Sequence, residues 1–431
     1  KFMNEFVKNL TAKKKIFLRK LIIFYFFYVL LEGALRKWVL PNLATEIILV
    51  RDFLVIFIIM QGFTNKLYNF NSYLEKSALI WTVLVLFWIV LQHAFIDIPA
   101  GVSFIGFRCW VLYIWFSVLI FRIFNNFNEM NQFIDKIIYS LIPISLLVLV
   151  QHYLPPEHLI NKQTGTGYIF TIANDIVRVT GTFSFTFGQV QYMAFITPFF
   201  LYFILERNKQ ISLFIKIILS FSFLTCVFVS GARGTILYVS FMIFFALCFN
   251  KTNKSFITSS LILLPLVLIC FFVFERAIDA TLLRFAVSGD ASSSIMRLIN
   301  TFLPDMSTWR DYSTLGRGIG FAANMSRIYL GEDFRISEHE SDSIIVEGGI
   351  LGVIFLFIKI LIATKCVSSA IKIYQNFYTA LPLYLSIYFF IQILINPITK
   401  QITTHAFTFL SLGLLLIVLN HYSKEKNNNY L

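Results

Sequence analysis

Long apolar runs separated by short polar segments recur along the whole chain. A helix needs about 20 apolar residues to cross the hydrocarbon core of a bilayer. The pattern therefore predicts an all-α, polytopic integral membrane protein, with about twelve transmembrane helices in a single transmembrane domain over residues 1–431. The predicted spans are 17–35, 44–63, 78–96, 102–124, 134–153, 185–205, 211–230, 234–250, 255–275, 343–364, 379–396 and 401–421.

The composition agrees with this pattern. Hydrophobic residues make up 58% of the chain and charged residues 14%, whereas soluble domains average about 45–50% and about 25%. A soluble fold of this length could not bury so much apolar surface. The first apolar run follows a basic segment but no small-residue cleavage site follows it, so we expect it to be retained as a transmembrane helix.

The basic residues predict the orientation. The formal net charge is +13, and the Lys and Arg residues lie mainly in the polar segments. Each segment on the N-terminal side of the membrane has at least two basic residues, whereas the short connections 97–101, 230–234 and 397–400 have at most one. The positive-inside rule then places both termini in the cytoplasm. No basic and aromatic stripe is present, so nucleic acid is not an expected partner.

Two outer segments are long, namely 153–184 and 276–341, the second of them between the ninth and tenth predicted helices. Loops of this length are usually functional or disordered. Apolar residues have helical spacing in the larger loop, so we expect it to be partly helical; they are Leu282, Leu283, Phe285, Ile295, Leu298 and Ile299. Its basic residues are all arginines, at positions 276, 284, 297, 310, 317, 327 and 335. Arginine suits bidentate contact with phosphate or carboxylate, which indicates an anionic ligand; the alternative is pairing with acidic residues of the loop.

Two further places carry candidate chemistry. Arg233 lies in the turn Ser230-Gly231-Ala232-Arg233-Gly234-Thr235, where glycine allows close approach to a ligand; the alternative is an arginine that extends from a helix end to the membrane surface. His339 lies beside Glu338, Glu340 and Asp342. Carboxylates can orient an imidazole as a general base, although a surface histidine is the simpler interpretation.

Other chemistry finds little support in the sequence. Arg51 and Asp52 lie within the second apolar run, and the simplest interpretation is that they neutralise each other. The five cysteines are widely spaced, which argues against a disulfide framework. There is no spacing typical of metal ligands and no glycine-rich nucleotide loop, so we expect no metal and no cofactor.

The chain resembles the O-antigen ligase and polymerase superfamily, including Wzy-like O-antigen or capsule repeat-unit polymerases. Four stretches carry the resemblance, and they cover about a tenth of the chain: Arg178-Val179-Thr180-Gly181-Thr182-Phe183, Ser230 to Gly234, Gly316-Arg317-Gly318-Ile319-Gly320-Phe321, and His339-Glu340-Ser341-Asp342-Ser343 through Glu347-Gly348-Gly349-Ile350-Leu351-Gly352. Glu340 stands where the family has asparagine.

The resemblance implies a bacterial inner-membrane enzyme with its active site in the periplasmic loops. It would join undecaprenyl-pyrophosphate-linked oligosaccharide repeat units by an inverting, metal-independent glycosyl transfer that releases undecaprenyl pyrophosphate. The implied base is His339, and because Glu340 departs from the family pattern, Glu338, Glu340 or Asp342 could replace it. Arg233 would stabilise the leaving group. The residues expected to bind the pyrophosphate or the glycan are Arg233, Arg284, Arg297, Arg178 and Arg276. Membrane lipid and a chain-length regulator protein are further implied partners.

Three other functions remain open at the level of sequence. A ligase that transfers the glycan to lipid A core or to a protein would use the same residues. The segment Leu31-Glu32-Gly33-Ala34-Leu35-Arg36-Lys37-Trp38 resembles one in polymerase-like members, and this resemblance favours the polymerase. A polysaccharide transporter or flippase would be expected to show two related halves and polar residues near the midplane. A structural or sensor protein is the third alternative.

Overall fold

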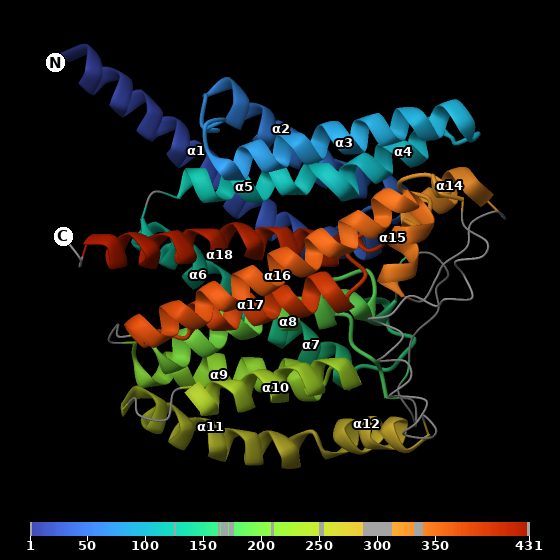
Figure 1. Cartoon of the computed structure of the whole chain (residues 1–431). Coiled ribbons are helices and arrows are strands. Elements are labelled where there is room, and N and C mark those ends of the chain that lie inside the picture. Colours follow the sequence, from blue (N-terminus) through green and yellow to red (C-terminus); the bar gives the residue numbers. More distant parts are fainter. Residues whose placement is uncertain are drawn as a thin grey trace.

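The computed structural model describes residues 2–124, 126–162, 164, 171, 176–207, 211–249, 254–287, 313–331 and 339–428, with side chains except at 2–11, 254–262, 284–287 and 426–428. Within these ranges the secondary structure is helical, apart from one isolated bridge between Thr171 and Val177. The helices lie alongside one another in a bundle (Figure 1). The prediction of an all-α fold is confirmed for this part of the chain.

The described helices follow the predicted apolar runs. In chain order they are α1 (Phe2–Ala34), η1 (Leu35–Val39), η2 (Pro41–Leu43), α2 (Ala44–Thr64), α3 (Tyr73–Phe95), α4 (Ala100–Phe107), η3 (Arg108–Leu112), α5 (Tyr113–Ile123), α6 (Phe127–Tyr139), α7 (Leu141–Tyr153), η4 (Leu159–Asn161), α8 (Thr186–Leu205), α9 (Leu213–Phe228), α10 (Arg233–Phe249), α11 (Lys254–Val273), α12 (Glu275–Val287), η6 (Asn324–Ser326), α14 (Arg327–Leu330), α15 (Glu340–Gly348), α16 (Ile350–Phe377), α17 (Leu381–Ile395) and α18 (Ile402–Asn428).

Six helical stretches of the described chain are long and apolar enough to cross a membrane: Tyr73–Phe95, Ala100–Ile123, Phe127–Tyr153, Thr186–Leu205, Ile350–Phe377 and Ile402–Glu425. Shorter apolar helices cover Leu213–Phe228, Arg233–Phe249, Leu263–Val273 and Leu381–Ile395. Their length and composition are consistent with a multi-pass membrane protein. The total of twelve spans and the sides on which the loops lie stay predictions.

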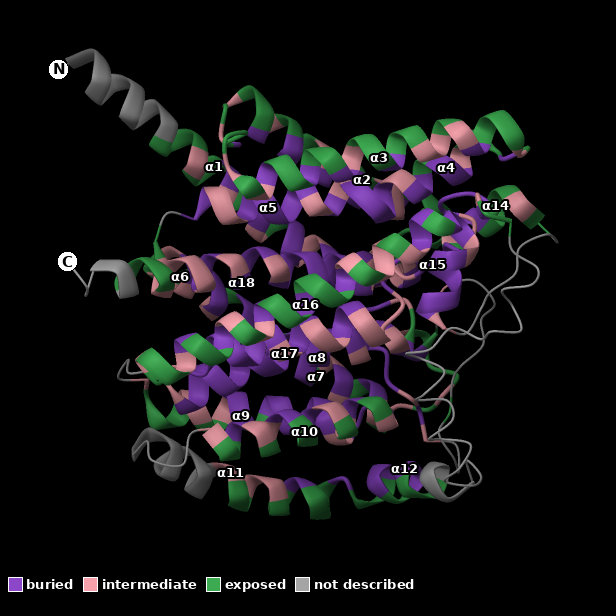
Figure 2. Cartoon of the chain, in the orientation of Figure 1, coloured by how far each residue is buried: buried purple, intermediate pink, exposed green. Residues whose placement is uncertain are grey.

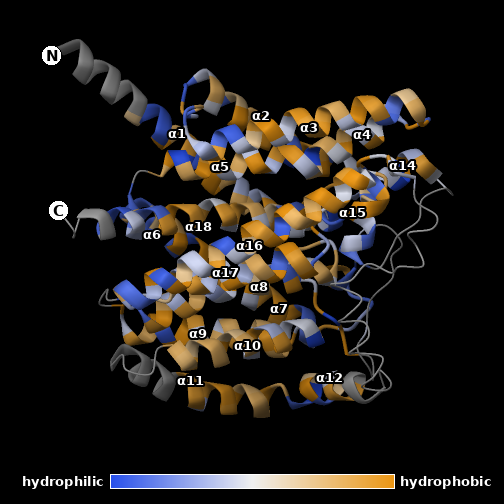
Figure 3. Cartoon of the chain, viewed as in Figure 1, coloured by the Kyte–Doolittle hydropathy of each residue, from blue (hydrophilic) through white to orange (hydrophobic). Residues whose placement is uncertain are grey.

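Helix α8 forms the centre of the bundle. Nearly all of its residues are buried, and it contacts α10, α17, α18 and α11 (Figure 2). Helices α3 and α16 lie at the periphery, where their exposed residues are largely apolar (Figure 3). Leu79, Ile80 and Phe87 of α3 are examples. Exposed apolar side chains of this kind suit contact with lipid tails, so the outer helices can be apolar on every side.

One predicted helix is divided in two. The run 343–364 was expected to form a single span, but α15 ends at Gly348 and α16 begins at Ile350. Gly349 between them has φ +54°, a left-handed conformation that glycine adopts without strain. A Cβ on Gly349 would also overlap with the carbonyl oxygen of Thr314. The break therefore exists because the backbone of the 313–326 loop passes against this position.

The two long segments that the sequence predicts on the outer side are partly helical where the structure describes them. Helix α12 occupies the start of the 276–341 loop, in agreement with the expected short helix around Leu282 and Leu283, and α14 lies near its end. In the 153–184 segment, the short helix η4 follows α7. The remaining apolar positions of the predicted loop helix, beyond residue 287, lie outside the described residues.

Candidate functional site

Helix ends from distant parts of the chain meet on the side of the bundle opposite the chain termini (Figure 1). They are the end of α1 with η1, the start of α2, the turn 396–401 between α17 and α18, and the start of α15. Elements η1 and η3 are single π-helical turns. The second, η3, lies between α4 and α5 and contributes the side chain of Arg108. Single π-helical turns often mark functional sites because they redirect side chains.

Arg51 of α2 is almost completely buried, and it pairs with α1. Its Nη1 atom lies 3.2 Å from Glu32 Oε2, and the two side chains are 1% and 8% exposed. Arg51 Nε and Nη2 are buried and have no hydrogen-bond partner among the described residues. Buried N–H groups of a cation are rarely left unsatisfied. Arg51 therefore presents two donors to the interior that a ligand or water could use.

Asp52, the next residue, has different partners. Arg108 Nη1 donates a hydrogen bond to Asp52 Oδ2 at 2.6 Å, and the Tyr113 hydroxyl donates to Asp52 Oδ1 at 3.1 Å. The suggestion that Arg51 and Asp52 neutralise each other is thus replaced by two ion pairs, Glu32–Arg51 and Asp52–Arg108. A buried pair needs close geometry and additional hydrogen bonds to offset desolvation, and the Tyr113 hydroxyl supplies one.

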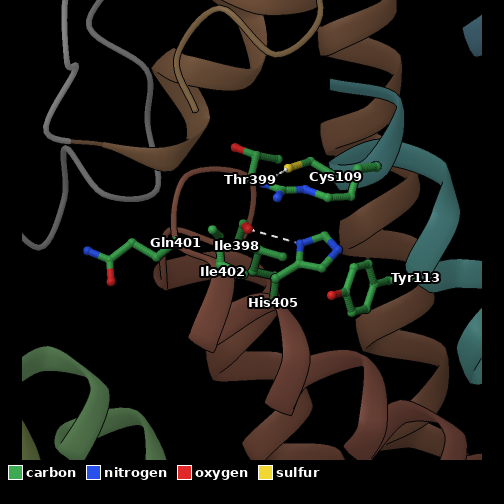
Figure 4. Close-up of a pocket in the computed structure, with 8 residues that line it drawn as sticks. Cys109, Tyr113, Ile398, Thr399, Gln401, Ile402 and His405 are labelled. Atoms are coloured by element: carbon green, nitrogen blue, oxygen red, sulfur yellow. Dashed lines mark hydrogen bonds between the residues drawn. The ribbon is translucent and has the colours of Figure 1, made fainter. Parts of the chain in front are cut away.

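A small pocket lies beside Arg108 (Figure 4). It is lined by residues of η3, of the start of α5, of the turn after α17 and of the start of α18, namely Arg108, Cys109, Tyr113, Ile398, Thr399, Gln401, Ile402 and His405. In Figure 4 the Gln401 side chain points away from the pocket. The pocket thus lies directly next to one of the two buried ion pairs.

Glu340 reaches the same turn from α15. Its Oε1 atom accepts a hydrogen bond from the Thr399 backbone N–H at 2.9 Å and lies 3.6 Å from Lys359 Nζ of α16. Glu340 is buried, and its Oε2 atom has no hydrogen-bond partner among the described residues. His339 precedes it at the start of α15, and its carbonyl oxygen accepts a hydrogen bond from Lys400 Nζ at 2.9 Å. Two of the predicted catalytic residues therefore contact the 396–401 turn, which also supplies residues that line the pocket.

The segment Leu31–Trp38 contacts one of the four stretches that carry the family resemblance, Arg178–Phe183. Lys37 Nζ of η1 donates to Thr180 Oγ1 and to the Gly181 carbonyl, both at 2.9 Å. Gln151 of α7 binds the same backbone, since its Oε1 accepts from Gly181 N–H at 2.8 Å. Burial lowers the pKa of the Lys37 amine to about 7. These contacts fix the segment that carries Arg178.

The loop 313–326 is attached to helices α3 and α15 by side chains. Gln92 of α3 accepts from Ile319 N–H and donates to the carbonyls of Leu315 and Glu347. Glu347 of α15 accepts from the Trp110 indole N–H at 2.8 Å and from Ala322 N–H at 3.0 Å. Two of the motif stretches, Gly316–Phe321 and Glu347–Gly352, therefore form one packed unit next to the pocket.

Glycine is required for this packing. Gly320 has φ +94°, and a Cβ on it would overlap with the Val102 carbonyl of α4. A Cβ on Gly106 of the same helix would overlap with the Ile319 carbonyl. The glycines of Gly316–Phe321 thus serve a close approach between backbones.

Of the other predicted site residues, the structure describes the side chains of Arg233, Arg178 and Arg276. Arg233 is half-buried at the start of α10, after Gly231 with φ +58°. Arg178 is half-buried, and Arg276 is exposed on α12. The backbone of Arg284 lies on α12, but its side chain lies outside the described residues, as do Arg297 and Glu338 entirely.

Several residues of this site did not stand out in the sequence. They are Arg108, Lys359 and His405, each a single Arg, Lys or His residue within a largely apolar run, together with Glu32, which the sequence brought in only as part of the segment Leu31–Trp38. The isolated charge in an apolar run was the signal available for Arg108 and Lys359. Among the described residues, no group of three acidic, His or Cys side chains is arranged to hold a metal ion.

Comparisons of the chain with protein-family models, with curated proteins and with solved structures gave no match. The fold and site above place the chain in the class of multi-pass α-helical membrane proteins with buried charges at one side of the bundle.

Proposed function

We propose that this protein is a glycan polymerase that joins lipid-pyrophosphate-linked oligosaccharide repeat units at the outer face of the bacterial inner membrane. The donor is an undecaprenyl-pyrophosphate-linked glycan, and a hydroxyl group of a second lipid-linked repeat unit is the acceptor. The transfer inverts the anomeric centre and releases undecaprenyl pyrophosphate. The donor already carries a good leaving group, so the reaction needs no nucleotide.

The buried guanidinium group of Arg51 carries the proposal. A charged residue buried at membrane depth is expensive and is functional by default. Glu32 contacts one N–H group of Arg51, and Nε and Nη2 are left without a partner among the described residues. A phosphate group could accept hydrogen bonds from both Nε and Nη2, because guanidinium groups often bind phosphate through two parallel N–H groups. An anionic lipid headgroup that enters from the outer face would satisfy both donors.

The chemical roles follow from the charge that develops during transfer. Negative charge accumulates on the pyrophosphate as its bond to the sugar breaks, and preorganised cations stabilise that charge best. Arg51 supplies one cation, and Arg233 supplies a second from the start of α10. Arg178, Arg276, Arg284 and Arg297 are candidates for binding the acceptor pyrophosphate or the glycan. A base near the pocket, for which the sequence offers His339, Glu338 and Glu340, takes the proton of the acceptor hydroxyl.

The test is a transfer assay with purified protein in lipid vesicles. The substrate is the lipid-pyrophosphate-linked repeat unit extracted from the source organism, and metal ions and nucleotides are omitted. Wild type should produce a ladder of longer lipid-linked glycans. Arg233→Ala should lose at least a hundredfold in rate, because an electrostatic stabiliser of the transition state typically contributes 10²–10³. Arg327→Ala is the matched control, because Arg327 is an exposed arginine of the same outer region.

The outcomes separate the polymerase from its alternatives. Transfer that appears only after lipid A core or an acceptor protein is added would identify a ligase. A wild type that transfers glycan to none of these acceptors, but moves the lipid-linked unit across the vesicle membrane, would identify a transporter. Equal rates for Arg233→Ala and Arg327→Ala would remove Arg233 from the mechanism.

A further inference from the structure

Two guanidinium groups share one carboxylate where α1 meets α2. Glu32 Oε2 lies 3.2 Å from Arg51 Nη1, and Glu32 Oε1 lies 3.8 Å from Arg36 Nη1. Among the described residues, no second acid lies within ion-pairing distance of either arginine, since Asp52 is paired with Arg108. Arginine keeps its proton in proteins, so positive charge exceeds negative charge in this group. Buried charge is normally compensated, and a further anion would compensate it here.

Arg36 is the cation of this group that reaches the surface. Its side chain is 19% exposed, whereas that of Arg51 is 1% exposed. Arg36 Nη1 donates a hydrogen bond to Ser184 Oγ at 3.0 Å, while Nε and Nη2 bind none of the described residues. An anion can therefore approach Arg36 without entering the interior of the bundle. Because both arginines contact Glu32, the charge of Arg51 also attracts an anion bound at Arg36.

The surface beside Arg36 is apolar. Val39, Leu40 and Leu43 follow it in the chain, and all three are exposed. Phe185, next to the serine that binds Arg36, is exposed as well. A cation bordered by exposed apolar side chains matches a ligand that has an acidic headgroup and a hydrocarbon tail, since basic pockets of membrane proteins bind the headgroups of anionic lipids.

The guanidinium group of Arg36 is held in place by a packed backbone. A Cβ on Gly33 would lie 2.4 Å from the backbone nitrogen of Ser184, so glycine lets α1 approach the segment before α8 closely. That approach brings the Ser184 hydroxyl to Arg36, and Lys37 holds the same segment by two further hydrogen bonds. An arginine that only extended from a helix end to water would need none of these contacts.

We propose that Arg36 binds the diphosphate of a polyprenyl lipid whose tail lies against Val39, Leu40 and Leu43. This inference rests on the proposed function, because it names the place where the lipid-linked substrate binds from the bilayer. Each phosphate of a diphosphate carries negative charge, so this headgroup matches the excess of positive charge better than the phosphodiester of a phospholipid does. The planar guanidinium group also suits contact with two phosphate oxygens at once.

The experiment measures binding to the full-length protein in phosphatidylcholine nanodiscs. The probes are undecaprenyl pyrophosphate, inorganic pyrophosphate and phosphatidylglycerol, and wild type should bind the first most tightly. Arg36→Gln keeps an N–H for Ser184 but removes the charge. Its affinity for undecaprenyl pyrophosphate should fall about tenfold or more, the usual effect of losing a hydrogen bond to a charged group. Arg19→Gln is the matched control, because Arg19 also lies on α1, pairs with Glu129 and is 18% exposed.

A second variant tests the place of the tail. Leu40→Ala should lower the affinity for undecaprenyl pyrophosphate about fourfold or more, the effect of losing contact with one methylene group, and should leave the affinity for inorganic pyrophosphate unchanged. Leu79→Ala on α3 is its control, because Leu79 and Leu40 are both 44% exposed. Equal affinities of Leu40→Ala and Leu79→Ala would overturn the placement of the tail.

The other outcomes decide separate points. An Arg36→Gln variant that binds undecaprenyl pyrophosphate as tightly as Arg19→Gln overturns the inference. Wild type that binds inorganic pyrophosphate or phosphatidylglycerol equally well overturns the assignment to a polyprenyl lipid. If Arg36→Gln does not fold, Arg36→Lys takes its place, since a point charge cannot replace the planar fork, and an unchanged affinity overturns the inference equally.

Binding and transfer fail independently. Binding through Arg36 by a protein that transfers glycan to no acceptor refutes the proposed transfer and leaves the lipid site intact. Glycan transfer by wild type, together with unchanged binding by Arg36→Gln, overturns the inference about Arg36 alone.

Discussion

Arg51 Nη1 lies 3.2 Å from Glu32 Oε2 of the preceding helix, while Asp52, the next residue in the chain, accepts its hydrogen bond from Arg108. Two adjacent residues of opposite charge therefore connect α2 to different neighbours, α1 on one side and the α4–α5 junction on the other. Each ion pair is buried. The stability of this side of the bundle should depend on keeping both pairs intact.

Breaking the first pair should be strongly destabilising. Glu32→Ala leaves the Arg51 charge buried and without its carboxylate, and such a change typically costs about 3–5 kcal/mol. The double variant Glu32→Gln with Arg51→Met removes both charges and should recover much of the loss. The measurement is the free energy of unfolding in detergent. A single variant as stable as wild type would show that the pair contributes nothing.

The same double variant separates stability from activity. If Arg51 binds the pyrophosphate, the folded Glu32→Gln/Arg51→Met protein should still lose at least a hundredfold in transfer rate, because no cation replaces the guanidinium. The vesicle assay measures that rate on protein first shown to be folded. An active double variant would assign Arg51 a purely structural role.

A methyl group at Gly106 should disturb the 313–326 loop. Gly106→Ala places a Cβ against the backbone carbonyl of Ile319, so the loop must move away from α4. Overpacking of this kind typically costs about 1–3 kcal/mol. Gly234→Ala is the control, since a Cβ there meets no atom within 4 Å. Thermal unfolding in detergent should show a lower midpoint for Gly106→Ala and little change for Gly234→Ala.

Lys37 should make stability depend on pH. Its pKa is lowered from 10.5 to about 7 by burial, so between about pH 7 and pH 10 the folded amine has lost its proton while the unfolded amine still binds one. The free energy of unfolding therefore rises with pH across this range. Lys37→Met removes the titrating group, so the rise should be smaller in the variant. Unfolding midpoints at pH 7 and pH 9.5 test this, and equal rises in both proteins would contradict it.

The Trp110 indole should stabilise the loop through Glu347. Trp110→Phe keeps an aromatic ring but removes the N–H that donates to Glu347 Oε2. A buried acceptor that loses its donor typically destabilises a protein by about 1–3 kcal/mol. Trp88→Phe is the matched control, because the Trp88 indole N–H also binds the loop, at the Leu315 carbonyl, but the Trp88 side chain is only half-buried. Equal losses of stability in Trp110→Phe and Trp88→Phe would show that the deeper burial of the Trp110–Glu347 hydrogen bond adds nothing to its contribution.

The helices could be predicted from the sequence because the apolar signal is local. The charge pairs could not, because their partners lie far apart in the chain: Asp52 and Arg108 are 56 residues apart. Nothing near Arg108 in the sequence indicates whether the guanidinium faces an acid, a ligand or lipid. The neighbouring acid Asp52 suggested the wrong partner for Arg51, because sequence proximity does not bring side chains of successive helical residues face to face.

Sequence reasoning could point to only some residues of the site, because the others are brought together from distant parts of the chain. His339 attracted notice because acidic residues surround it in the sequence, and it contacts the 396–401 turn, as Glu340 does. His405 has no charged neighbours in the sequence and lies in an apolar run. Its environment is supplied by Arg108, Tyr113 and the turn at Ile398, which only the folded chain brings together.

The attachment of the 313–326 loop has a consequence for biosynthesis. Gln92 lies in α3, 227 residues before Ile319, whose N–H it binds. A ribosome adds about 5–20 residues per second, so Ile319 is synthesised on the order of ten seconds or more after Gln92. During that interval a side-chain amide that is fully buried in the finished protein must be hydrated or bound to another polar group. An assembly factor or lipid headgroup that occupies Gln92 in this window would hold the nascent bundle open until the last third of the chain arrives.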